Sequence, residues 1–180
     1  ADDIQDPQIA LTCTSGITDM TNLFSLFSGN DVSSFNQNLE HWDVSNVTNM
    51  ANLFAGASSF NQPLNDWDVS SVNSFFQAFA LANSFNQPLD NWDVSSATTM
   101  QSMFTVIGNN TSSFNQPLDN WDVSNVTNMR QMFASASVFN QPLNNWDVSN
   151  VTNMSVMFSD AKAFDQPLNN WDVSNVTEMA

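Results

Sequence analysis

Hydrophobic and polar positions recur along this chain with a period of about 25 residues. The block Phe-Asn-Gln-Pro-Leu begins at Phe60, Phe85, Phe114 and Phe139, with variants at Phe35 and Phe164. Seven residues after each of these phenylalanines comes a tryptophan that Asp-Val-Ser follows. These tryptophans are Trp42, Trp67, Trp92, Trp121, Trp146 and Trp171. Such self-similarity is typical of repeat proteins, in which each repeat is one small unit stacked on its neighbours.

One repeat has too few hydrophobic positions to form a core alone. In the repeat from Phe139, nine of 25 positions are apolar: Phe139, Leu143, Trp146, Val148, Val151, Met154, Met157, Phe158 and Ala161. Stacking aligns these positions from coil to coil, and burying each large side chain contributes about 1.5–3 kcal/mol. A helical-hairpin repeat is excluded, because no stretch keeps a 3.6-residue period beyond one or two turns.

The spacing also predicts the path of each coil. Trp146 and Val148 alternate with polar residues, which is typical of a short β-strand. Residues 154–158 have apolar side chains at the i, i+3, i+4 spacing of a short helical turn, and Asn153 precedes them as an N-cap. The pattern predicts a solenoid of about six 25-residue coils, each with short parallel β-strands and one short helical turn. The usual crossover rule predicts a right-handed winding.

The repeats predict a simple domain organisation. We expect residues 1–16 to form an N-terminal lead-in or cap and residues 17–180 to form a single solenoid. The last repeat stops before its Met-Phe pair and is therefore incomplete. A terminal repeat normally needs a polar cap. We therefore expect either a longer parent chain or an open end that stacks on another copy.

Two connections, residues 25–34 and 106–112, are longer than the period requires. Insertions in a solenoid form loops on one side, often where partners bind. The second connection contains the candidate binding residues Ile107, Gly108, Asn109, Asn110 and Thr111. The alternative is a bulge without function, since the entropy cost of a loop grows slowly with its length.

The full motif, FNQPLNNWDVSNVTNMSVMF in its clearest copy, resembles the BspA-like leucine-rich-repeat surface proteins. The resemblance covers residues 35–179, with a weaker copy at residues 17–24. It implies a right-handed, leucine-rich-repeat-like solenoid on a microbial cell surface, used for attachment and protein contact, and it implies no catalytic residues. The departures from the motif are Asn38 for proline, Phe75 for methionine and Asp165 for asparagine.

Charge excludes several classes of partner. The chain has 18 acidic residues and two basic ones, Arg130 and Lys162, which gives a net charge of −16. Nucleic-acid binding needs Lys and Arg against phosphates, so it is excluded, as is polybasic membrane contact. No run of about 18 apolar residues exists to span a membrane. The single cysteine, Cys13, excludes an internal disulfide, and the start at Ala1 fits a processed secretory chain, so we expect an extracellular or cell-surface location.

An aspartate follows every tryptophan, at Asp43, Asp68, Asp93, Asp122, Asp147 and Asp172. Stacked coils place these carboxylates in a column with a spacing of about 4.8 Å. A Ca²⁺ column would relieve their repulsion, whereas the favoured alternative is that each aspartate caps a turn. A glycosidase pair is disfavoured, because identical environments do not push two pKa values apart.

Sequons for N-glycosylation are frequent. Four of them, at Asn46, Asn125, Asn150 and Asn175, recur within the repeat, and a structural asparagine explains them as well as a glycan does. Asn109 and Asn110 lie in the insertion and are the preferred glycosylation candidates.

The sequence predicts a non-catalytic extracellular repeat protein for surface display, adhesion or protein–protein recognition. The partner is a protein, a surface glycan or another copy of the chain. One alternative is a coat or fibre subunit that self-associates through stacked repeats. Another is a carbohydrate-binding solenoid with exposed tryptophans, although their alternation with valine favours the core. An ice-binding face would need the threonines Thr48, Thr127, Thr152 and Thr177 in a flat array.

Overall fold

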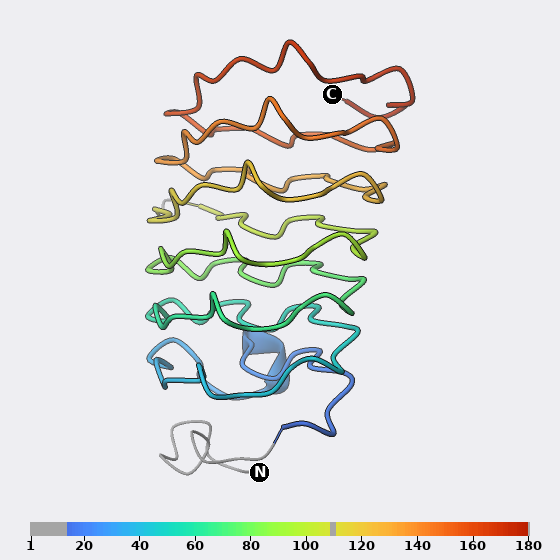
Figure 1. The fold of residues 1–180 in the computed structure, drawn as a ribbon. Helices are drawn as coiled ribbons and strands as arrows, with labels where there is room; N and C mark the ends of the chain where they lie inside the picture. The colour runs from blue at the N-terminus through green and yellow to red at the C-terminus, as the bar shows by residue number, and fades with distance from the viewer. Residues whose placement is uncertain (1–13, 109–110, 180) are drawn as a thin grey trace.

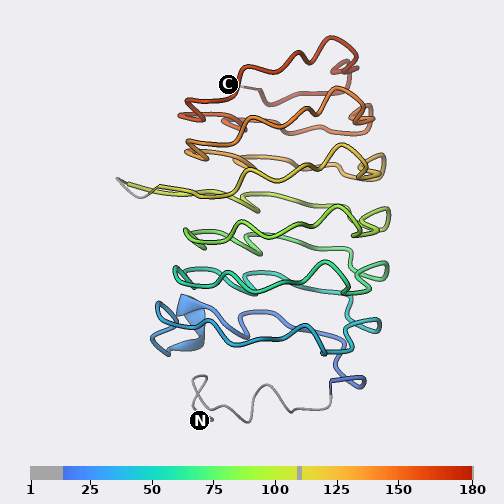
Figure 2. The same ribbon diagram turned by 60° about the vertical axis from the view of Figure 1, so that its left-hand side comes forward.

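The computed structural model describes residues 14–108 and 111–179, and this part of the chain forms a stack of coils (Figure 1). Each coil lies on the one before it, from the blue N-terminal end to the red C-terminal end, and the second view in Figure 2 agrees. Most of the predicted lead-in lies outside the described residues. The stack includes Met20 and Phe24, which are already buried.

The core lies inside the coils and is built from the predicted apolar positions. Leu143, Trp146 and Val148 are each at most 2% exposed. Equivalent rings stack between coils: the ring centroids of Trp121 and Trp146 are 6.4 Å apart, and their planes differ by 2°. This separation lies in the favourable range for aromatic pairs. Each coil therefore covers the apolar side chains of its neighbour, as the repeat pattern predicts.

Parallel β-pairing joins the coils at one residue per repeat. The bridges run through Asp19, Asn49, Ser74, Thr99, Asn128, Asn153 and Glu178, and in the described residues no strand is longer than one bridge. The strand predicted at residues 146–149 does not form there, because turns flank it. The backbone N–H of Trp146 donates to the Leu143 carbonyl at 3.1 Å, and that of Val151 donates to the Val148 carbonyl at 2.9 Å. The strand prediction is thus corrected in both position and length.

The helical turn predicted over residues 154–158 is also corrected, because this segment and its equivalents are series of tight turns. Every second backbone N–H donates to the next coil. The donors Met129, Gln131, Phe133 and Ser135 pair in order with the carbonyls of Asn153, Ser155, Met157 and Ser159. Gln131 and Ser135 have φ angles of 58° and 59°, a left-handed conformation that a right-handed helix excludes. Hydrogen bonding between coils therefore replaces hydrogen bonding within a helix.

The first long connection, residues 25–34, packs against the stack. It contains the 3-10 helix η2 (Leu26–Ser28), the single helical element of the described residues, which ends at Gly29 with a φ of 84°. Leu26 sits over Gly56 of the next coil, where an added Cβ atom would lie 2.5 Å from Leu26 Cδ2. No helix in the described part of the chain is long and apolar enough to cross a membrane.

A column of asparagines ties the Asn-Gln-Pro-Leu blocks together. The Oδ1 atom of Asn115 accepts the backbone N–H of Asn140 at 2.9 Å and a side-chain N–H of Gln141 at 3.1 Å. Asn61 and Asn86 accept the equivalent pair of bonds from the following coil. The polar part of each block therefore fixes the register between coils.

Candidate functional site

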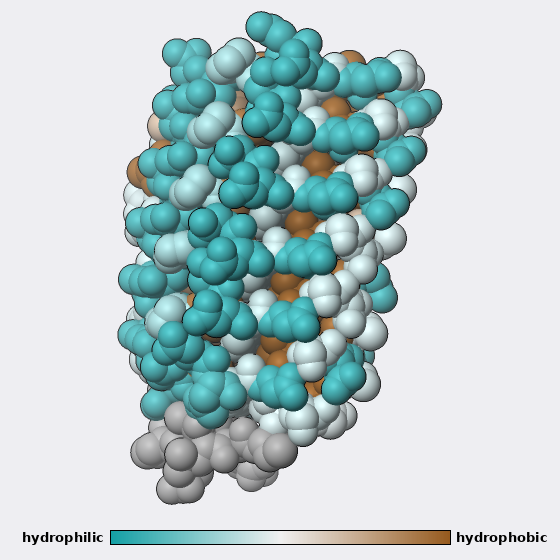
Figure 3. All heavy atoms as spheres, in the orientation of Figure 1, coloured by the Kyte–Doolittle hydropathy of each residue, from teal (hydrophilic) through white to brown (hydrophobic). Residues whose placement is uncertain are grey.

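The polar side chains lie in columns along the stack. Figure 3 shows these hydrophilic columns, with hydrophobic atoms visible in a strip between two of them. In one column, Asp93 Oδ1 accepts the backbone N–H of Ser95 at 3.0 Å and its hydroxyl at 2.6 Å. The same backbone bond forms at Asp43, Asp68, Asp122, Asp147 and Asp172. These are the hydrogen bonds that turn capping predicts.

Hydrogen bonding and charge act in opposite directions on the pKa values of this column. The hydroxyl and the backbone N–H of Ser95 lower the pKa of Asp93. The backbone N–H and the hydroxyl of Ser174 lower the pKa of Asp172, whereas the negative charge of Asp147 in the neighbouring coil raises it. Neighbouring carboxylates in the column therefore repel each other.

The predicted calcium column finds no ready-made cluster. Among the described residues, no group of three or more His, Cys, Asp or Glu side chains is arranged to hold a metal ion. Shallow hollows beside the column contain two of its carboxylates each, Asp68 with Asp93 and Asp147 with Asp172. Since Ca²⁺ takes six to eight oxygen ligands, Asn side chains and water would have to supply the rest. Calcium binding stays a prediction.

The tryptophan column lies mostly in the core. The indoles from Trp42 to Trp146 are at most 6% exposed, and Trp171 is partly exposed. The Nε1–H of Trp146 donates to the Leu118 carbonyl of the preceding coil at 2.8 Å. Equivalent bonds come from Trp67, Trp92, Trp121 and Trp171. Five of the six rings therefore do not offer a face to a sugar.

The recurring sequon asparagines hold coils together. The Nδ2 atom of Asn150 donates to the Ser124 carbonyl at 2.7 Å. The equivalent bonds of Asn46, Asn125 and Asn175 reach Ser15, Ser95 and Ser149. The nitrogen that would carry a glycan is thus engaged at each of these four positions. The preferred candidates Asn109 and Asn110 lie outside the described residues.

The threonine column is exposed, but its hydroxyl groups take part in bonds between coils. Thr152 Oγ1 donates to the Thr127 carbonyl at 3.1 Å, and Thr127 Oγ1 donates to the Thr98 carbonyl at 3.2 Å. The backbone N–H groups of the same residues donate to the same carbonyls at 2.9 Å. The threonines therefore form a structural ladder, and the asparagine Asn73 interrupts it.

The second long connection projects from the stack. Figure 2 shows the chain next to its grey residues reaching beyond the edge that the other coils form. Val106 is buried, and its backbone N–H donates to the Ala134 carbonyl at 3.0 Å. The next residue, Ile107, is 61% exposed, and Gly108 turns the chain with a φ of 69°. Thr111 is exposed as well. Three of the five predicted binding residues are therefore seen at a projecting loop.

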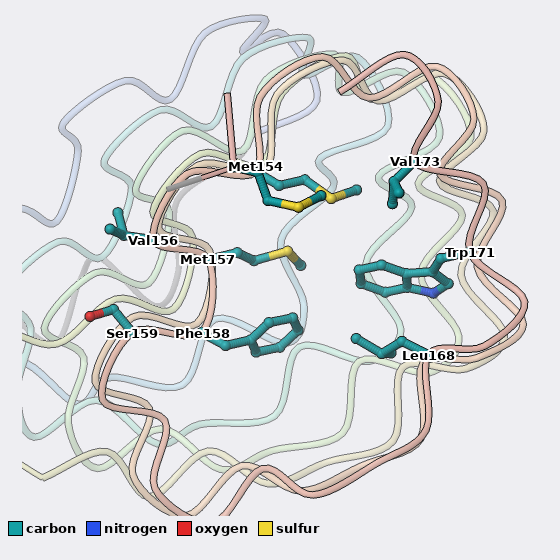
Figure 4. Close-up of a pocket in the computed structure, with 9 residues that line it drawn as sticks. Met154, Val156, Met157, Phe158, Ser159, Leu168, Trp171 and Val173 are labelled. Carbon is teal, nitrogen blue, oxygen red and sulfur yellow. The ribbon is translucent and has the colours of Figure 1, made fainter. Parts of the chain in front are cut away.

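A hydrophobic cavity of about 550 Å³ lies on the end face of the last coil (Figure 4). Its lining consists of Met154, Val156, Met157, Phe158, Ser159, Leu168, Trp171, Val173 and Met179. The sequence analysis assigned most of these residues to the core and did not predict a site among them. The signal that could have found it is the incomplete last repeat, which leaves the preceding coil with less cover.

Comparisons with known proteins place the chain among repeat proteins. A protein-family model described as "Mycoplasma protein of unknown function, DUF285" matches residues 2–110 and again residues 107–180. Two matches in tandem agree with the repeat pattern of the sequence. Comparisons with curated proteins and with solved structures found no significant match.

Proposed function

Since the chain belongs to this Mycoplasma family of unknown function, we propose that it is a non-catalytic protein displayed outside the cell, where it binds a protein or a surface glycan. We further propose that its stack of coils is a right-handed solenoid of the BspA-like leucine-rich-repeat type. The 25-residue motif, the single parallel bridge per coil and the asparagine column support this assignment.

The repetition of each polar group supports a role other than catalysis. General acid–base chemistry needs titratable groups in unlike environments. The column aspartates instead repeat one environment, in which Asp93 and Asp147 each accept the N–H of a serine two residues on. The asparagines and threonines are likewise used to hold neighbouring coils together.

The projecting connection is the observation that favours recognition. The stack keeps its register on both sides of it, because Val106 donates to Ala134 and Ser113 donates to Asn83. The extra residues therefore leave the frame unchanged and add an exposed apolar side chain, Ile107, outside it. Loops held by a rigid scaffold are common binding elements.

Adhesion of protein-coated beads to cultured mammalian cells tests the proposal. One variant lacks residues 107–110, which restores the 25-residue period, and another carries Ile107→Asp. Val138→Asp is the matched control, because Val138 is also an exposed valine-type side chain, 42% accessible, but lies outside the insertion. We expect wild-type and control beads to adhere, and both insertion variants to lose most of their adhesion.

Pretreatment of the cells identifies the partner class. Protease-sensitive adhesion indicates a protein partner, and glycosidase-sensitive adhesion indicates a glycan. Absence of adhesion by the wild-type beads would contradict the proposed function. Equal adhesion by wild type and both insertion variants would contradict the assignment of the binding site to this loop.

A further inference from the structure

We propose that the end face of the last coil binds a repeat segment of another polypeptide, which adds to the stack as one more coil. The end face comprises the residues that line the cavity near Trp171 (Figure 4). This inference does not depend on adhesion through the projecting connection. It rests on the continuity of the end face with an interface that the stack repeats coil after coil.

The apolar part of the end face matches the surface that each lower coil presents to its neighbour. Val148 is 1% exposed beneath the next coil, whereas the equivalent Val173 is 39% exposed. Trp146 is 2% exposed, whereas Trp171 is only partly buried. Side chains that are fully covered in the other repeats thus line an open cavity here. A coil with leucine, tryptophan and valine at the same positions would fill it.

The acceptor groups of the end face specify a ligand of the same kind. In the coil below, the Leu143 carbonyl accepts the indole N–H of Trp171 at 2.9 Å, and the Ser149 carbonyl accepts the side-chain N–H of Asn175 at 2.7 Å. The carbonyls at the equivalent positions of the last coil belong to Leu168 and Ser174. Within the described residues they accept no such bond. A ligand that supplies an indole N–H and an asparagine amide at this spacing would complete them.

Donor groups on the opposite side of the same face complete the template. Phe133 and Ser135 donate their backbone N–H groups to the next coil. The equivalent N–H groups, those of Phe158 and Asp160, donate to no carbonyl within residues 14–108 and 111–179. Unpaired backbone groups at the edge of a regular array bind further chain segments, as in β-strand addition. The occupant therefore needs both a matching backbone and matching side chains.

Charge gives the proposed interaction a distinctive salt dependence. An added coil would place its own aspartate next to Asp172, just as Asp172 lies next to Asp147, which raises its pKa. Like charges repel, and salt screens that repulsion. Binding should therefore become tighter as salt concentration rises, opposite to an interaction that attraction between unlike charges drives.

A peptide with the sequence of residues 139–163 is the probe, because it contains one complete repeat. Fluorescence anisotropy of the labelled peptide measures binding to the full chain. Val173→Arg and Met179→Arg place a charge at the mouth of the cavity, where these side chains are 39% and 56% exposed. Val138→Arg is the matched control, since Val138 is 42% exposed and does not line the cavity.

We expect saturable binding to wild type and to the Val138→Arg variant, and binding weaker by about tenfold or more in the two end-face variants. A scrambled peptide should not bind, and affinity should increase between low and moderate salt. The proposal is overturned if the peptide does not bind wild type, or if it binds the end-face variants equally well. Self-association of the chain that Val173→Arg abolishes and the peptide does not inhibit would instead assign the face to a second copy.

Discussion

The indole N–H of Trp146 donates to the backbone carbonyl of Leu118 in the neighbouring coil at a distance of 2.8 Å. The tryptophan is 2% exposed and the leucine is fully buried, so this bond lies in the core. The same carbonyl accepts the backbone N–H of Trp121 at 3.1 Å. One acceptor therefore joins the turn of its own coil to the core side chain of the next, which explains why tryptophan rather than phenylalanine recurs at this position.

Replacing Trp146 with phenylalanine should therefore destabilise the fold by about 2–4 kcal/mol. The change removes a buried hydrogen bond, worth about 1–3 kcal/mol where a group is left unsatisfied, and also leaves a cavity. Urea denaturation followed by circular dichroism measures the loss. Trp171→Phe is the control, since it removes the equivalent bond to Leu143 at a partly exposed ring. Equal losses in the two variants would refute the role of burial.

The contact between Leu26 and Gly56 predicts a specific cost for an added methyl group. Gly56→Ala should lower the free energy of unfolding by about 2–4 kcal/mol, since a left-handed alanine and a steric clash each cost 1–3 kcal/mol. Gly29→Ala is a matched control, because its φ is also 84° but nothing lies within 4 Å of its added Cβ. Thermal denaturation compares them. Addition of Leu26→Ala should restore part of the stability lost in Gly56→Ala and would leave it unchanged if the clash were absent.

The hydroxyl of Ser95 predicts a measurable titration shift at Asp93. Because the serine lowers the folded-state pKa of Asp93 below its ordinary value, its hydrogen bonds contribute stability above the unfolded-state pKa. That contribution is lost as pH falls through the folded-state pKa. Ser95→Ala should raise the pKa of Asp93, as NMR titration of its side-chain carboxyl would show. The pKa of Asp147, in another repeat, should not change, and an unshifted Asp93 would contradict the assignment.

The net charge of −16 predicts that salt stabilises the chain. Raising NaCl from about 10 mM to 150 mM shortens the Debye length from about 30 Å to 8 Å, which screens repulsion along the aspartate column. We expect the melting temperature to rise by roughly 2–4 °C, as about 1 kcal/mol gives in a chain of this size. Scanning calorimetry measures it. A fall with rising salt would show that attractive ion pairs dominate.

Calcium provides a separate test of the same column. If the column binds Ca²⁺, CaCl₂ should raise the melting temperature more than MgCl₂ does at equal concentration, because a ligand that binds the folded state stabilises it. Asp147→Asn and Asp172→Asn should remove that excess. Equal effects of the two salts would assign the whole response to screening and would contradict the predicted calcium site.

Global periodicity was easier to predict from the sequence than local backbone conformation. The burial of Leu143, Trp146 and Val148 follows from their recurrence alone. The backbone of residues 154–158 did not follow, because apolar side chains at i, i+3 and i+4 point to one side both in a helix and in this series of turns. Which of the two forms depends on where the amides find acceptors, and those acceptors belong to another coil. Single-repeat reasoning cannot include that contact.

The candidate sites show the same division. The capping role of Asp93 depends on a serine two residues away, so local sequence sufficed to propose it. The cavity near Trp171 depends instead on what the next coil fails to cover. A residue's repeat position predicted its place in the core, but its exposure also depends on which repeats surround it.

The hydrogen bonds that flank the projecting connection, from Val106 to Ala134 and from Ser113 to Asn83, separate its length from the geometry of the frame. Its residues can be exchanged, lengthened or shortened at a small entropic cost. Substitutions at the bonded positions of the coils carry a much larger cost, because each would disturb two neighbours. The chain thus combines an interior under strong selection for sameness with one segment free to diversify, an arrangement that lets specificity evolve without refolding the protein.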